Sequence, residues 1–157
     1  MYKLFLFSSL LIMACATSVD RVAEIEKIRT MLKDERKAHF DKNVEAFLSN
    51  FADSTIQLNH GDIIIASKAE AKKRFTPYFE SVTFQKWDDV REPIIELSED
   101  GSMAYAALEK TVVLTYPDTL GKPLYDSANY AWVSIYRKID NQWKLVCNAS
   151  TQEECYN

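Results

Sequence analysis

The sequence predicts an α+β domain in which three N-terminal helices pack on a curved antiparallel sheet. Three observations support this fold class. Apolar residues recur with helical spacing between residues 20 and 52, a helix-start signal follows a short hairpin, and two-residue alternation dominates the chain after residue 83. Helices that come first and strands that come last indicate helices gathered on one face of the sheet.

Two apolar stripes predict the first two helices. The first stripe predicts a helix near 20–39, and the second predicts a short helix near 43–51 that Asp41 or Asn43 can cap. The first stripe consists of Val22, Ile25, Ile28 and Leu32, and the second of Phe40, Val44, Phe47, Leu48 and Phe51.

A hairpin and a third helix follow. Strands are predicted over 55–59 and 63–66. They are joined at Gly61, which can take the positive φ that a tight turn needs. Ser67 and Glu70 have the spacing of a capping box and predict a helix that starts there. Pro77 is expected to kink that helix or to restart it.

The rest of the chain predicts four strands. Their expected ranges are 83–97, 103–116, 126–138 and 142–151. The last two are joined by a turn at Asp140-Asn141, and alternation is clear from Tyr130 to Arg137. The resulting order, helices first and an antiparallel sheet last, completes the α+β prediction.

Three sequence runs resemble a known superfamily. The runs VEAFLSNFADS, PIIELSEDGSMAYAAL and ANYAWVSIYRKIDNQWKLVCNAST are similar to the nuclear transport factor 2-like fold, and more narrowly to its SnoaL-like, ketosteroid-isomerase-like branch. The similarity covers roughly residues 20–151. It implies a cone, in which three helices close over the concave face of a bent sheet and leave a pocket at one end. Members include enzymes and non-catalytic binding domains, so the fold does not give the function.

The first fifteen residues, MYKLFLFSSLLIMAC, resemble a bacterial lipoprotein signal. One lysine precedes an apolar run of residues 4–14, which is too short to cross a bilayer but suits an export signal. The ending Ile12-Met13-Ala14-Cys15 resembles a lipobox. We therefore expect a signal peptide over 1–14, a lipidated tether over 15–19 with the lipid on Cys15, and a SnoaL-like domain over 20–157.

This assignment predicts an exported bacterial lipoprotein in the cell envelope, bound to a membrane through its lipid on the periplasmic or outer-surface side. The alternative is an ordinary secretory signal cut after Ala14-Cys15-Ala16, which predicts a secreted soluble protein. A lipid on Cys15 leaves Cys147 and Cys155 as an even pair. They could form a disulfide outside the cytoplasm. The alternative is a buried strand Cys147 and an unpaired Cys155.

Charge and motifs exclude several function classes. The net charge is −4 and becomes −5 without Lys3, and no Lys/Arg cluster is present, so nucleic acid is not an expected partner. The two histidines are isolated, and no C-x-x-C, H-E-x-x-H or glycine-rich phosphate loop occurs. We therefore expect neither a metal site nor a cofactor.

The resemblance to ketosteroid isomerases does not extend to their catalytic positions. The base would fall near Gln57, Leu58 or Asn59, none of which is a carboxylate, and no Tyr lies between residues 20 and 51. His39, expected as an imidazolium at a helix end, and His60, in a tight turn, suit structural roles. No catalytic residue is assigned.

Five residues remain as candidates for a ligand pocket. They are Asn59, Tyr105, Glu109, Tyr130 and Trp132. Aromatic walls with sparse polar groups are typical of small-molecule sites. The leading hypothesis is a non-catalytic, membrane-anchored domain that binds a small apolar or amphipathic ligand or a partner segment. The alternatives are an acid–base enzyme of isomerase, dehydratase or hydrolase type on such a ligand, and a homodimerising interaction domain that uses the outer face of its sheet.

Overall fold

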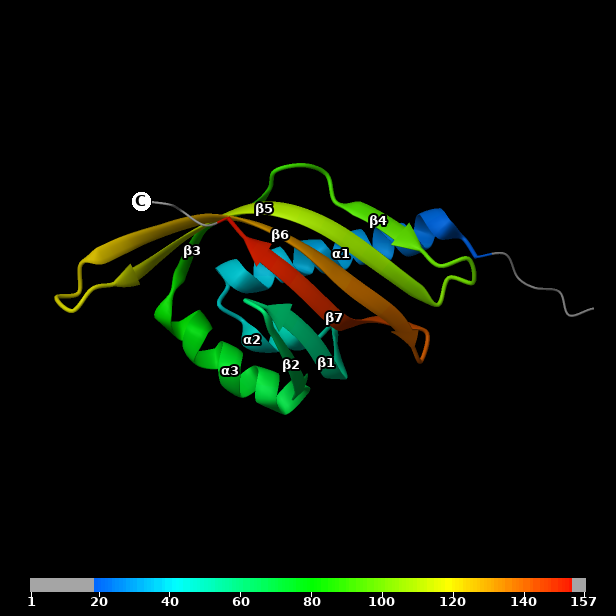
Figure 1. The fold of residues 1–157 in the computed structure, drawn as a ribbon, viewed down its shortest axis with the longest axis horizontal. Helices are drawn as coiled ribbons and strands as arrows, with labels where there is room; N and C mark the ends of the chain where they lie inside the picture. Colours follow the sequence, from blue (N-terminus) through cyan, green and yellow to red (C-terminus); the bar gives the residue numbers. More distant parts are fainter. Residues whose placement is uncertain (1–18, 154–157) are drawn as a thin grey trace, which may run out of the picture.

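A computed structural model describes residues 19–153 and confirms the α+β architecture. Three helices lie against one face of a bent sheet (Figure 1). They are α1 (Arg21–Phe40), α2 (Val44–Leu48) and α3 (Lys68–Ser81). The seven strands are β1 (Phe51–Asn59), β2 (Asp62–Ser67), β3 (Thr83–Asp89), β4 (Ile94–Leu97), β5 (Met103–Pro117), β6 (Pro123–Ile139) and β7 (Gln142–Gln152). The signal peptide, the tether up to residue 18, and Cys155 lie outside the described residues.

The strands form one sheet in the order β2-β1-β7-β6-β5-β3, and β4 also pairs with β5. All pairs are antiparallel except β1–β7, which is parallel and therefore departs from the prediction. The long β5–β6 hairpin extends beyond the helices at one end of the molecule (Figure 1). No helix within residues 19–153 is long and apolar enough to cross a membrane.

Local signals account for the helix ends. Asn43 caps α2 through its side chain, and Ser67 and Glu70 form the expected capping box at the start of α3. Helix α3 continues through Pro77 without restarting there. Helix α2 is shorter than predicted because Phe51, the last member of its apolar stripe, opens β1 instead.

Two further predictions were wrong in detail. The strand predicted over 83–97 is interrupted, and its halves β3 and β4 pair with successive parts of β5. Pro93, which has no backbone N–H to donate to a ladder, lies in the interruption. Val22 was expected in the apolar stripe of α1 but is 74% exposed. The buried stripe continues instead from Ile28 and Leu32 to His39.

The start of α1 is fixed against the turn between β4 and β5. The Arg21 guanidinium donates hydrogen bonds to the carbonyl oxygens of Leu97 and Ser98. Gly101 has a φ of +65°, and a Cβ placed there would lie 2.7 Å from Cγ1 of Val19. The chain that enters the domain therefore packs on the β4–β5 turn.

Two apolar clusters lie between the helices and the sheet. The larger joins α1, α2 and α3 to β4–β7 and includes Ile28, Leu48, Leu108 and Leu145. The smaller consists of Val82, Phe84, Val112 and Leu114, with Trp87 and Tyr130 packed on it. Residues of both clusters line a cavity, so the cavity lies where the two clusters meet.

Candidate functional site

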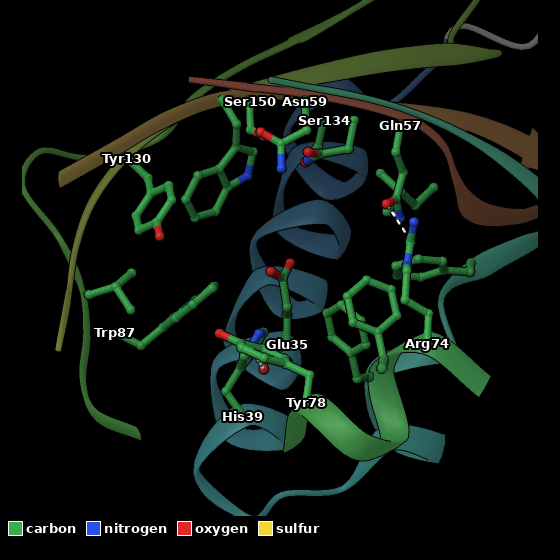
Figure 2. A pocket seen from close by; sticks show the side chains of 17 residues that line it. Glu35, His39, Gln57, Asn59, Arg74, Tyr78, Trp87, Tyr130, Ser134 and Ser150 are labelled. Carbon is green, nitrogen blue, oxygen red and sulfur yellow. Dashed lines mark hydrogen bonds between the residues drawn. The ribbon is translucent and has the colours of Figure 1, made fainter. Parts of the chain in front are cut away.

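The cavity has a volume of about 450 Å³ and lies between the helices and the concave face of the sheet. Three helices and five strands contribute to its wall (Figure 2). Its aromatic lining consists of Phe47, Phe51, Phe75, Tyr78, Trp87, Tyr130 and Trp132. Its polar lining consists of Glu35, His39, Gln57, Asn59, Arg74, Ser134, Asn148 and Ser150. A volume of this size accommodates a small organic molecule.

Three of the five candidate pocket residues line this cavity. Asn59 comes from β1, and Tyr130 and Trp132 come from β6. Tyr105 and Glu109 do not line it, which corrects the prediction for these two residues. They alternate along β5 with the buried Ala104, Ala106 and Leu108, so they face the opposite side of the sheet. Glu109 is paired there with Arg91.

Glu35 is the main residue that the sequence analysis missed. Its side chain rises from α1 into the middle of the cavity (Figure 2). Among residues 19–153, no side chain or backbone group donates a hydrogen bond to its carboxyl oxygens within standard geometry. Burial raises the pKa of Glu35 to about 7, the Lys110 ammonium opposes this rise, and Asp89 adds to it. Near neutral pH the carboxyl group can therefore either accept or donate a proton.

His39 lies one helical turn after Glu35, and its environment corrects the expected imidazolium. The ring is 3% exposed, stacks on Trp87 with 3.8 Å between ring centroids, and contacts three phenylalanines. Burial lowers the pKa of His39 to about 4, although its Nδ1–H donates to the Glu35 carbonyl at 2.7 Å. The neutral ring thus keeps its Nε2 lone pair as an acceptor.

Two tyrosines add hydroxyl groups on the side of the cavity near Trp87 (Figure 2). Burial raises the pKa of Tyr78 to about 12, with contributions from Tyr130 and Asp126. Burial and Asp126 also raise the pKa of Tyr130. Both hydroxyls therefore remain protonated and can donate hydrogen bonds to a bound molecule.

Arg74 and Gln57 form a second polar group, away from Glu35 (Figure 2). The Arg74 guanidinium donates a hydrogen bond to the side-chain oxygen of Gln57 and lies 4.8 Å from the centre of the Phe75 ring. A third group is formed by Asn148, whose side-chain amide donates to the Ser134 hydroxyl at 3.0 Å. The cavity thus combines an aromatic wall with polar groups that converge from opposite sides.

Several predicted or expected sites are placed elsewhere. His60 lies in the β1–β2 turn with a φ of +51°. Cys147 is half-buried on β7 and is not among the lining residues. Its disulfide with Cys155 stays a prediction. In the part of the chain that the structure describes, no group of three or more His, Cys, Asp or Glu side chains is arranged to hold a metal ion.

Solved structures share this architecture. A ketosteroid isomerase-like protein from Erwinia carotovora atroseptica superposes with a TM-score of 0.66 at 15% identity, covering 87% of this chain and 99% of that one. The domain has the nuclear transport factor 2-like fold. A nuclear transport factor 2-like protein from Cytophaga hutchinsonii gives a TM-score of 0.61 at 14% identity, covering 82% and 98%. Another, of unknown function in nutrient uptake, from Rhodospirillum rubrum gives 0.63 at 13%, covering 81% and 98%.

Neither a protein-family model nor a curated protein sequence matches the chain. At these low identities the structural likeness establishes the nuclear transport factor 2-like fold alone. Function must therefore be argued from the residues that line this cavity.

Proposed function

We propose that the chain is a domain that binds a small amphipathic molecule in the cavity between its helices and its sheet. The observation that carries this proposal is the combination of an aromatic wall, a cavity-facing Glu35 carboxyl group and a buried Trp87 indole N–H that has no hydrogen-bond partner among residues 19–153. Buried polar groups normally have hydrogen-bond partners. A bound molecule with a polar group supplies such a partner, while its apolar part contacts the aromatic rings.

A thermal-shift screen of sterols, fatty acids and small aromatic acids tests this proposal. A ligand present at 100 times its Kd adds about 2.7 kcal/mol to the free energy of unfolding. The variant Ser134→Trp fills the cavity wall and should remove the shift, whereas Ser127→Trp, on the exposed far part of β6, should retain it. An equal shift in both variants would place binding outside the cavity and contradict the proposal.

The location that we propose for this domain is the outside of the cytoplasm, held by a lipid on Cys15. The support is the apolar run that ends in a lipobox-like sequence. Cells grown with labelled palmitate should incorporate the label into the wild-type chain and not into Cys15→Ser. Label that persists in the variant would contradict a lipid on Cys15, and no label in either protein would support a cleaved and secreted protein.

An acid–base enzyme is the second candidate, and the environment of Glu35 favours it. A carboxyl group with a pKa of about 7 beside a neutral imidazole is suited to proton transfer at neutral pH. The test substrate is 2-tetralone, a bicyclic ketone with acidic hydrogens. The wild-type chain should accelerate deuterium uptake from D₂O, and Glu35→Gln should return the rate to that of buffer. Equal rates of deuterium uptake with both proteins would show that Glu35 is not the group that transfers the proton.

Self-association is a third candidate, which the outer face of the sheet favours. Two rows of mainly apolar residues cross this face from β4 or β5 to β2 in continuous register. We call them the outer band. One row is Ile94, Ala107, Val133, Ala149, Leu58 and Ile63, and the other is Tyr105, Ile135, Cys147, Ile56 and Ile65. An apolar surface this continuous is typical of a protein–protein contact.

A further inference from the structure

We infer that the ligand of the cavity is a small carboxylate, whose negative charge is bound by Arg74 and whose apolar part lies against the aromatic wall. This inference rests on the proposed ligand-binding function and adds the chemical class of the ligand. It is carried by the position and the partners of Arg74.

Arg74 is a cavity-lining cation that has no carboxylate partner among residues 19–153. Its side chain is partly buried, and within residues 19–153 its side-chain hydrogen bond goes to the neutral Gln57. The ion pairs found among residues 19–153 involve other basic side chains, including Lys72, the neighbour of Arg74 on α3, which pairs with Glu45. A guanidinium removed from bulk water gains most from a carboxylate, which it can bind through two parallel hydrogen bonds.

The other charges of the cavity fix the orientation of an anion. Lys110 and Asp89 are the charged groups that shift the pKa of Glu35, and Arg74 forms no ion pair with Glu35 in the part of the chain that the structure describes. Lys110 is itself paired with Asp89. A bound carboxylate would be repelled by an ionised Glu35 and attracted by Arg74, which lies on another side of the cavity (Figure 2).

The other charges of helix α3 largely offset one another. Lys68, Lys72 and Lys73 are accompanied by Glu70 and Glu80 on the same helix, and Lys72 is paired with Glu45. Among the basic residues of α3, Arg74 is the one that lines the cavity, so the attraction of an anion there rests on its guanidinium.

The composition of the wall favours a carboxylate over a phosphate. One guanidinium and one amide supply enough charge and hydrogen-bond donors to bind a carboxylate monoanion, whereas a phosphate dianion normally requires several cationic or backbone donors. The remaining surface near Arg74 is aromatic, with Phe75 on α3 and Phe47 and Phe51 opposite it. A flat apolar body of about ten carbon atoms fits the cavity volume of about 450 Å³.

The test compares 2-naphthoate with its uncharged counterpart 2-naphthamide, using the full chain purified in a mild non-ionic detergent. Trp87 and Trp132 line the cavity, so binding should change tryptophan fluorescence. In the wild-type chain naphthoate should bind about tenfold more tightly than the amide. Arg74→Gln should abolish that preference and leave the affinity for the amide within about twofold.

Lys73→Gln is the matched control because it removes a cation from the adjacent, exposed position of α3. It should retain the preference for naphthoate. Gln57→Glu is a second variant that keeps Arg74 and places a carboxylate on the side chain that accepts its hydrogen bond. This variant should melt at a higher temperature than wild type and should lose the preference for naphthoate, even if Arg74→Gln fails to fold.

Each remaining outcome contradicts a defined part of the argument. Equal wild-type affinities for naphthoate and naphthamide would overturn the carboxylate inference and leave the binding function intact. If 2-naphthyl phosphate binds more tightly than naphthoate, the ligand class is a phosphate ester and the carboxylate inference is wrong. If neither naphthoate nor naphthamide binds, the cavity does not take a bicyclic ligand, and both the inference and the proposed function fail for this size class.

Discussion

The two faces of β5 and β6 differ in what they contact, although the same strands supply both. On the concave face, even-numbered side chains such as Leu108 and Ser134 meet the helices or line the cavity. On the convex face, odd-numbered side chains such as Tyr105 and Val133 form part of the outer band and are about 40% exposed. The concave face therefore supplies both the packing that stabilises the fold and the residues that line the cavity. The convex face contributes little to the stability of the monomer.

The largest expected effect comes from shortening a side chain on the concave face. Leu108→Ala should lower the free energy of unfolding by about 3 kcal/mol, because it leaves a void among packed residues. Val133→Ala, next to it on the convex face, should cost about 0.5 kcal/mol. Urea denaturation measures both values. Similar costs for the two variants would mean that the convex face is also covered in solution.

A similar effect that depends on pH is expected from Glu35, the ionisable group that faces the cavity on the concave side. Its folded pKa of about 7 lies above the ordinary value of 4.5, so the protonated form is favoured in the folded state. The folded protein is therefore destabilised as pH rises from 4.5 through 7. Glu35→Gln should raise the free energy of unfolding by roughly 3 kcal/mol at pH 8 and leave it unchanged at pH 4.

His39 provides an internal check on that comparison. Its folded pKa of about 4 lies below the ordinary value of 6.5, so its neutral form stabilises the folded state above pH 6.5. That stability is lost as pH falls from 6.5 through 4 in wild type and in Glu35→Gln alike. The difference in the free energy of unfolding between wild type and Glu35→Gln therefore reports the contribution of Glu35 alone. A difference that is independent of pH would show that the carboxyl group has an ordinary pKa.

The smallest effect on monomer stability is expected on the convex face. Ile135→Lys, in the middle of the outer band, should change the free energy of unfolding by less than about 0.5 kcal/mol. If the outer band mediates self-association, the same variant should convert a dimer to a monomer in analytical ultracentrifugation. Ser127→Lys, farther along the same strand, should remain a dimer. A wild-type monomer at high concentration would remove the dimer hypothesis.

Local signals made much of the fold predictable. Ser67 and Glu70 form a capping box that depends only on residues three apart, and the turn at Asp140 and Asn141 has the two positive φ values that a tight hairpin requires. The interruption between β3 and β4 was harder to foresee. It depends on which segments pair with β5, and such pairing is a tertiary property.

The site was less predictable because it depends on which face of α1 is buried. The apolar stripe through Ile28 and Leu32 continues at helical spacing to Glu35 and His39, so these two residues shared the buried face in the sequence. Their buried position was not predicted because ionisable side chains are normally assigned to the exposed face of a helix. Tyr105 and Glu109 failed as candidates because alternation alone does not show which face of a strand is inside.

The contact between Val19 and Gly101 has a consequence for orientation if Cys15 carries the lipid that we propose. Three residues separate Val19 from Cys15, and the four residue-to-residue steps between them span at most about 14 Å in an extended chain. With the lipid proposed on Cys15, the β4–β5 turn would face the bilayer at close range. The tip of the β5–β6 hairpin, at the other end of the molecule, would then point away from the lipid surface (Figure 1). The short tether proposed between the lipid and Val19 would thus give the domain a preferred orientation on the membrane.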